Sequence, residues 1–537
     1  MYNKGLFHKW VPGVVMLLLF FLILVILLVT NPIYPANIGQ MVSSTGIIAE
    51  VFTWATFSGT IGMGVAIPFI MRFKMRFRSK ELMLVSLLSM AALSIVIAET
   101  SSAEVIVASC FAFGFMKMYG MVEVVLPIRG ILSPDGSNGA FYSKFYPIAI
   151  GAGQLANPFI AKLALGINWQ MLHYYSAALF LLTALLCVIV MHNLRFAPKM
   201  SLKGLDWLGA VLFAVPLMCF SYIVIFGRQQ DWFHSPNITY AAIAMVIFIG
   251  LLLWREFTIP NPLLKFKIYK ISSVRIGLLL LVGQGIFMGA SSIQSIYTAA
   301  ILGYNWIQNA SLSVMSVPGI VIAGLVAFHW TKNNIPLKMY IFSCFASYII
   351  YFTMLYFMMV PGLNIESFLV PQLFNGYGMG GLFISLWIYT LAKVPQQDML
   401  PSVAPVMVFR SIICTAFFTG FFSWAQYALQ VESVSNLAFY FDLNAMALDP
   451  STGNFGSIQL GAVLAANKKL AGYVIIAGFA FLTFIFFHQF GTFRNRLHHN
   501  KALRELRKNK KGKTAESLSR EEKENLSEEI SDIAGVL

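Results

Sequence analysis

The sequence predicts an all-α polytopic membrane protein with about fourteen transmembrane helices. Of its 537 residues, 58% are hydrophobic and only 11% are charged, which excludes a soluble enzyme built around one core. Long apolar stretches follow one another from Trp10 to Phe490 and lack the alternating pattern of a membrane barrel. With no water available to their backbone groups, these stretches must be helices.

The predicted spans are separated by short connections. In chain order they cover residues 10–30, 46–70, 81–98, 104–128, 144–166, 171–192, 205–226, 237–256, 274–297, 309–330, 338–359, 366–391, 402–428 and 470–490. The first stretch is too long for a signal-peptide core and has no small-residue cleavage site after it. We therefore expect it to remain as the first helix.

Basic residues indicate how the helices are oriented. If the helices alternate, most of the 37 Lys and Arg residues fall on one side of the membrane. The strongest signal is the loop after the second span, which contains Arg72, Lys74, Arg76 and Arg78. Because positive residues accumulate in cytoplasmic loops, both termini are expected in the cytoplasm. The net charge of +15 is explained by this topology, so no nucleic-acid partner is expected.

The polar segments suggest two further features. Residues 431–469 are predicted to form a large external loop, with Asp442 and Asp449, that is a candidate for contact with a partner. Residues 491–537 carry a basic run followed by an acidic one, as in a solvated tail. The five cysteines lie in apolar stretches without metal-ligand spacing, so neither a metal nor any other cofactor is expected.

Few ionisable side chains lie inside the predicted spans, where a charge is costly unless it lines a cavity or finds a partner. They are Glu50, Lys117, Glu123, Lys162 and Arg410. Glu123 and Glu50 are the candidates for proton coupling, and Glu123 is the deeper of the two. The alternative for Glu123 is a permanent ion pair, with Lys117 or Arg410, that only holds helices together.

Cationic and amide side chains are the candidates for substrate contact. Lys117 and Arg410 are suited to an anionic group, and Lys117 is also suited to act as a fixed charge in place of a sodium ion or proton. The uncharged candidates are Gln154, Asn157, Gln372 and Asn375. Amides of this kind also bridge helices, which is the alternative for each of them.

The fifth span resembles a known sequence motif. GQLANPFIAK, from Gly153 to Lys162, is similar to the antiporter motif of the major facilitator superfamily. Asn157 stands for the second glycine of that motif and Pro158 matches its proline, while Ala161 and Lys162 replace the final glycine pair. Small residues allow close helix approach and a proline bends the helix, so the motif's physical logic is partly kept.

Five further stretches resemble one branch of that superfamily, the fourteen-helix drug:proton antiporters of the EmrB/QacA type, in the same order. They are INWQMLHYYSAALFL (167–181), LDWLGAVLF (205–213), NPLLKFKIYK (261–270), LGYNWIQNASLSVMSVPG (302–319) and FNGYGMGGLF (374–383). The resemblance implies two six-helix bundles, residues 1–200 and 261–490, with helices 7 and 8 inserted as residues 201–260. It also implies alternating access around a midplane cavity.

The sequence departs from that branch at three places. In the loop after the second span only the basic half of the gating motif remains, Arg72 to Arg78. Thr30 and Asn31 end the first span where the branch usually has an Asp. Met116 occupies the place of its usual Arg in the fourth span, where the only cation is Lys117.

The predicted function is secondary active transport, with proton-coupled efflux of amphipathic organic compounds across a bacterial inner membrane as the favoured activity. The alternative is uptake or exchange of an anionic metabolite through Lys117 and Arg410. A membrane enzyme or receptor is the remote alternative, because the sequence has no phosphate-cradling glycine loop, HExxH motif or paired carboxylates. The resemblance further implies a periplasmic adaptor and an outer-membrane channel as partners.

Overall fold

The computed structural model describes residues 6–490 except 9, 134–136, 194–198, 200, 203–204, 260–262, 265, 334, 396–398, 441–453 and 489. Residues up to Phe486 form one packed unit. The described residues contain helices and no β-strand. The end at which the first helix begins is called the inner end below, because we expect it to face the cytoplasm.

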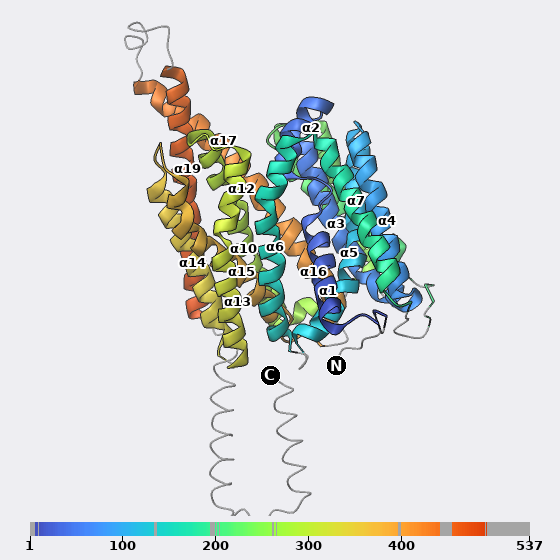
Figure 1. The fold of residues 1–537 in the computed structure, drawn as a ribbon. Coiled ribbons are helices and arrows are strands. Elements are labelled where there is room, and N and C mark those ends of the chain that lie inside the picture. The colour runs from blue at the N-terminus through green and yellow to red at the C-terminus, as the bar shows by residue number, and fades with distance from the viewer. Residues whose placement is uncertain are drawn as a thin grey trace, which may run out of the picture. The chain divides into compact units, whose positions relative to one another are not determined.

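Successive spans run back and forth through the unit, and several of them consist of consecutive helical segments (Figure 1). The helices are α1 (Gly13–Val29), η1 (Pro35–Asn37), α2 (Ile38–Thr45), α3 (Ala49–Arg76), α4 (Ser79–Glu99), α5 (Ala103–Leu132), α6 (Asn138–Gly166), α7 (Trp169–Val190), α8 (Trp207–Phe226), η2 (Trp232–His234), α9 (Pro236–Thr258), η3 (Phe266–Lys270), α10 (Ser272–Gly289), α11 (Ser291–Ile296), the π-helical η4 (Tyr297–Ile301), α12 (Trp306–Met315), α13 (Val317–Lys332), α14 (Leu337–Met358), η5 (Ile365–Phe368), α15 (Leu369–Leu391), α16 (Met399–Val408), the π-helical η6 (Phe409–Cys414), α17 (Thr415–Tyr440) and α19 (Asn454–Phe487).

The prediction of about fourteen spans is confirmed. Twelve helical stretches in the described part of the chain are long and apolar enough to cross a membrane. α1 is a shorter apolar helix of 17 residues, and α15 is a continuous helix of 23 residues that contains several glycines. Both pack among the other spans, α1 against α5 and α6 and α15 between α13 and α14, so they complete the set of fourteen.

Two helix pairs pack so closely that only glycine fits between them. A Cβ atom at Gly62 of α3 would lie 2.1 Å from the backbone oxygen of Phe111 in α5, and one at Gly376 of α15 would lie 1.9 Å from that of Ser316 beside α13. Small residues permit this close approach. The van der Waals contact that results stabilises the helix pair, because the hydrophobic effect does not drive helices together within lipid. The α3–α5 pair in the first half thus has its counterpart in α13–α15 in the second.

A second pair of contacts repeats in the same way. Lys80, at the start of α4, donates to the backbone oxygen of Val188 near the end of α7 at 2.6 Å. Lys338, at the start of α14, donates to the backbone oxygen of Phe486 near the end of α19 at 2.7 Å. The third and sixth helices of each half are joined at the inner end by the same kind of bond, as expected of two related six-helix bundles.

The two halves meet along two lines of helices. α6 of the first half packs against α12, α13 and α15 of the second, and α16 of the second half packs against α3 of the first. A Cβ atom at Gly64 of α3 would meet the Val408 side chain of α16 at 2.5 Å. Figure 1 shows α6 and α16 between the two groups of helices.

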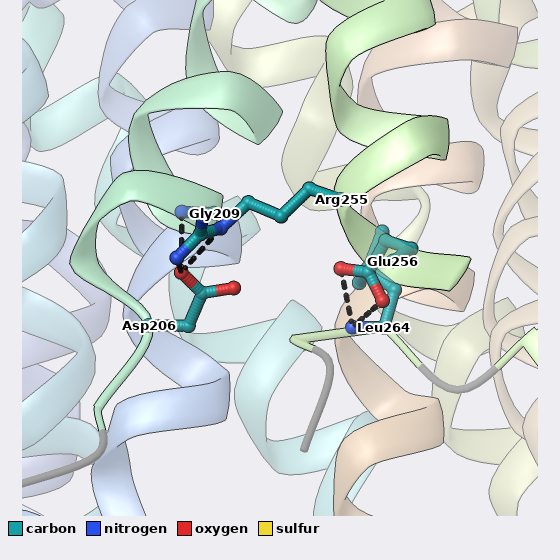
Figure 2. A network of polar contacts seen from close by, with 5 residues as sticks. All are labelled: Asp206, Gly209, Arg255, Glu256 and Leu264. Carbon is teal, nitrogen blue, oxygen red and sulfur yellow. Dashed lines mark hydrogen bonds and ion pairs between the residues drawn. The ribbon is translucent and has the colours of Figure 1, made fainter. Parts of the chain in front are cut away.

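The inserted helices α8 and α9 pack against each other, and α8 also contacts α3 and α17. Figure 2 shows the polar contacts at their inner ends. Asp206 accepts from the backbone nitrogen of Gly209 at 2.8 Å, as a helix N-cap, and pairs with Arg255 at 2.7 Å. The Glu256 carboxylate accepts from the Leu264 backbone nitrogen at 3.0 Å, which fastens the end of α9 to the segment leading to α10.

Several predicted boundaries are wrong. The second span continues to Arg76, so most of the predicted basic loop is helical. The external loop predicted for residues 431–469 is also largely helical, because α17 continues to Tyr440 and α19 begins at Asn454. Asp442 and Asp449 lie outside the described residues. Hydropathy does not detect these extensions, since a helix that leaves the apolar layer can turn polar without ending.

Candidate functional site

Glu123 of α5 is buried and forms an ion pair with Lys74 of α3. The Lys74 Nζ atom lies 2.8 Å from Glu123 Oε2, and the two side chains are 10% and 2% exposed. The partner is neither of the two cations considered from the sequence, Lys117 and Arg410. Lys74 reaches Glu123 because α3 stays helical beyond the predicted loop boundary. The pair therefore joins the inner parts of the two helices that pack at Gly62.

Lys117 of α5 is buried against the end of α1. Its Nζ atom donates to the backbone oxygen of Thr30 at 2.8 Å and to Asn31 Oδ1 at 3.0 Å. The acceptor carbonyl belongs to the carboxyl end of α1, where the helix dipole favours a cation. Lys117 thus contacts the place where the resembled antiporters carry an Asp, and here its acceptors are neutral.

Arg410 lies among aromatic rings from both halves of the protein. Its guanidinium carbon is 4.2 Å from the ring centre of Phe383 and 5.2 Å from that of Trp387, both in α15. The Tyr146 side chain of α6 lies close to the guanidinium. Tyr146 also packs edge-on against Phe383, with ring centres 6.0 Å apart, and Tyr142 stacks on Trp387 at 6.4 Å.

The amides Gln372 and Asn375 belong to a separate polar network. Gln372 donates to Gln294 Oε1 at 2.7 Å and accepts from Asn375 at 2.9 Å. Gln294 also accepts from the Tyr351 hydroxyl. The network joins α11, α14 and α15, as expected of amides that bridge helices. Asn375 precedes Phe383 by two helical turns, about 12 Å along α15, so the network is distinct from the Arg410 site.

The motif in α6 contacts the second half through its polar residues. Asn157 donates to Ser313 Oγ of α12 at 3.4 Å, and that hydroxyl donates to the Gln154 backbone oxygen at 3.1 Å. Pro158 lies inside the continuous helix, and Ala161 is buried. The expected close approach at Gly153 is absent, since a Cβ atom there would meet nothing within 4 Å.

Gly153 instead borders a small cavity of about 90 Å³ with Asn31, Tyr34 and Asn157. A larger cavity of about 400 Å³ lies between α10, α17 and α19, and its lining is apolar. None of the predicted site residues lines the larger cavity.

The remaining predicted residues lie near helix ends. Glu50 is half-buried in the first turn of α3, at the outer end. Arg72 and Arg76 belong to the last turns of the same helix. Arg78 precedes α4, with its Nε atom 3.9 Å from Glu81.

The intramembrane charges do not form one cluster among the described residues. Glu123 pairs with Lys74, Lys117 contacts the end of α1, and Arg410 contacts aromatic rings. The sequence did not indicate Lys74 as the partner of Glu123 or the rings of Tyr146, Phe383 and Trp387 as contacts of Arg410. The aromatic pairs Tyr142/Tyr146 and Phe383/Trp387 are each spaced by four residues, so the two rings of a pair lie on one helix face. This spacing is the sequence feature from which the aromatic site could have been predicted.

Comparison with known proteins supports the resemblance seen in the sequence, although no family model matches the chain. The chain is 21% identical over 398 residues to the probable multidrug resistance protein EmrY of Escherichia coli K12, covering 72% of this chain and 74% of that protein. It is 23% identical over 362 residues to the multidrug export protein EmrB of Haemophilus influenzae, covering 65% and 68%.

Solved transporter structures have the same fold. The peptide transporter PepTSo2 superposes with a TM-score of 0.54 at 13% identity, covering 88% of this chain and 96% of that one. The nucleoside transporter NupG superposes with a TM-score of 0.50 at 11% identity, covering 88% and 99%. The fourteen helices, the repeated contacts of the two halves and these relatives lead to one conclusion: the chain has the fold of the major facilitator superfamily transporters and resembles the EmrB type.

Proposed function

We propose that the protein exports amphipathic organic compounds from the cytoplasm and that proton entry drives the export. The observation that carries the proposal is the group around Arg410, where a cation and several aromatic rings lie between the two halves. Rings contribute apolar contact and the guanidinium contributes a fixed charge, a combination suited to amphipathic compounds. The names of EmrY and EmrB, multidrug resistance and multidrug export proteins, support this substrate class.

Glu123 is the proposed proton carrier. Protonation would cancel the charge that holds Lys74 at 2.8 Å and so loosen α3 from α5 at the inner end. α3 is also the helix that packs against α16 of the second half. Proton binding at Glu123 would therefore act on a contact between the halves, as alternating access requires.

Exchange of an anionic compound is the second candidate function. It is favoured by the absence of a salt bridge to Lys117 or Arg410 among the described residues. In such an exchange, each transported anion would neutralise the charge of Lys117 or Arg410 while it is bound.

Proton movement across the membrane of liposomes that contain the purified protein distinguishes the two functions. In sealed liposomes that contain the purified protein and a trapped pH dye, movement of an amphipathic organic compound should drive protons in the direction opposite to its own. Substrate movement without proton movement, but dependent on a counter-anion, would favour anion exchange.

We also propose that the outer parts of α17 and α19 contact an accessory protein, an adaptor of the kind implied by the resemblance. These parts are joined by an ion pair between Glu432 and Lys469 at 2.9 Å, so they offer an ordered surface in place of the expected loop. Cross-linking from Glu432 in whole cells should capture that protein, and capture of lipid or of the chain itself alone would count against it.

A further inference from the structure

Arg410 is held by aromatic rings and not by an acid. The Phe383 and Trp387 ring centres lie 4.2 and 5.2 Å from its guanidinium carbon, and the Tyr146 side chain lies close to it. No Asp or Glu within the described ranges forms a salt bridge with Arg410. Ring faces attract a cation but leave its net charge in place, and an intramembrane charge without an acidic partner is a candidate for binding a ligand or lining a pathway.

The four residues come from both halves of the protein, and three of them are partly exposed. Arg410, Tyr146 and Phe383 are each partly exposed, whereas Trp387 is buried. Tyr146 comes from α6 of the first half, and the other three residues come from α15 and η6 of the second. A ligand that touched all four would contact both halves, which is the condition for coupling its binding to their movement.

The backbone at Arg410 is π-helical. Residues Phe409–Cys414 form a π segment between α16 and α17, and the Thr415 side chain donates to the Arg410 backbone oxygen at 2.9 Å. A π segment inserts an extra residue into the helix and is frequent at functional sites. The segment changes the direction in which Arg410 leaves the helix without breaking the span.

We infer that Arg410, Tyr146, Phe383 and Trp387 form a binding site for planar aromatic anions, with aromatic carboxylates as the simplest class. The guanidinium would pair with the carboxylate through two parallel N–H donors, and the side-chain rings would pack against the ligand ring. This inference rests on the proposed transport function and narrows its substrates from amphipathic compounds in general to those with an acidic group on a ring.

The test compares 1-naphthoate with its neutral analogue 1-naphthamide, measured as binding to the purified full-length protein in lipid nanodiscs. Naphthoate should bind at least tenfold more tightly than naphthamide. Arg410→Gln should abolish that preference, and Arg410→Lys, which keeps the charge but loses the paired donors, should retain only part of it. Trp387→Leu should weaken both ligands, because it removes ring contact and leaves the charge.

Arg228→Gln is the matched control. Arg228 also lies over an aromatic ring, that of Tyr427 at 5.8 Å, but it is exposed in the connection after α8. Its replacement should leave the naphthoate preference unchanged.

Equal binding of the two ligands, or an unchanged preference in both Arg410 variants, would overturn the inference. If Arg410→Gln does not fold, Arg410→Lys and Trp387→Leu still decide it. Naphthoate binding that depends on Arg410, in a protein that moves no protons, would refute proton-driven export and leave the site standing. Proton-driven export of neutral compounds without naphthoate binding would refute the site alone.

Discussion

The charges inside the spans of this protein differ in the groups that contact them. Glu123 has an ammonium group from Lys74 at 2.8 Å, whereas Lys117 has two neutral oxygens and Arg410 has aromatic rings. An ion pair can be broken by protonating its acid, while hydrogen bonds from a lysine to neutral acceptors do not depend on an acid at all. At the residue scale this difference separates the proposed proton carrier from the two cations.

Glu123→Gln tests that assignment. The amide keeps the shape and hydrogen-bonding groups of the side chain but cannot titrate, so pH-driven accumulation of substrate should be lost. Substrate binding should stay within about tenfold, a difference of about 1.4 kcal/mol. Glu81→Gln is the control, because Glu81 is an exposed carboxylate at the inner end. Normal uphill transport by Glu123→Gln together with loss of transport in Lys117→Met would show that the assignment is wrong and would favour Lys117.

Asn31→Asp tests the contact of Lys117 with the end of α1. A carboxylate at this position would face the ammonium group from about the present Oδ1 position, 3.0 Å away, and should stabilise the protein to thermal unfolding. In a Lys117→Met background the same change should lose this stabilisation, because the acid would then have no ammonium partner. The double-mutant cycle should give a coupling energy of about 1 kcal/mol or more. An equal effect of Asn31→Asp in both backgrounds would contradict the contact.

At the scale of the helices, glycines allow the closest helix pairs to pack. These glycines lie outside the α6 motif that the sequence suggested as a site of close packing. α3 meets α5 at Gly62 and α15 meets α13 at Gly376, whereas Gly153 of the α6 motif has free space beside it. Free space at Gly153 borders the small cavity near Asn31. The motif's glycine thus leaves room beside α6 and does not bring α6 into contact with a neighbouring helix.

Gly62→Ala should therefore destabilise the protein much more than Gly153→Ala. A methyl group at Gly62 would lie 2.1 Å from a backbone oxygen, which forces the two helices apart at a cost of about 1 to 3 kcal/mol. The Gly153 change should stay within about 0.5 kcal/mol. Thermal unfolding of the two variants in the same detergent is the measurement, and equal stability would contradict the packing described here.

The spans were predictable from the sequence because lipid imposes them: only a long apolar helix satisfies its backbone in hydrocarbon. The ends of α3, α17 and α19 were not, since a polar or basic helix end has the composition of a loop. The intramembrane charges could be found from the same apolar background. Their partners could not be predicted, because the interacting residues come from different helices and are brought together only by packing. This is the case for Lys74 with Glu123 and for Tyr146 with Arg410.

At the scale of the whole molecule, the two halves repeat their internal contacts and meet along α6 and α16. The Lys80 and Lys338 bonds lie at matching positions in the two halves. Rigid halves joined along two lines can rock against each other around the residues between them. Arg410 and its rings lie at that junction, so the proposed substrate site is placed where such a motion would change its access.

The basic inner end predicts the orientation of the protein in the membrane. In a background without the five native cysteines, Ser435→Cys in the outer part of α17 should react with an impermeant maleimide added to intact cells. Lys332→Cys, at the inner end of α13, should react only after the cells are opened, because positive residues stay on the cytoplasmic side. The reverse pattern would invert the topology and with it the proposed direction of transport.

Proton-driven export is the central proposal, and uphill transport under an imposed pH gradient tests it most directly. Everted membrane vesicles that carry the protein should accumulate an amphipathic dye when their interior is made acidic. The accumulation should collapse when the gradient is dissipated and should be absent in vesicles that carry Glu123→Gln. Accumulation that ignores the pH gradient but follows an imposed gradient of an organic anion would contradict proton-driven export and would establish anion exchange in its place.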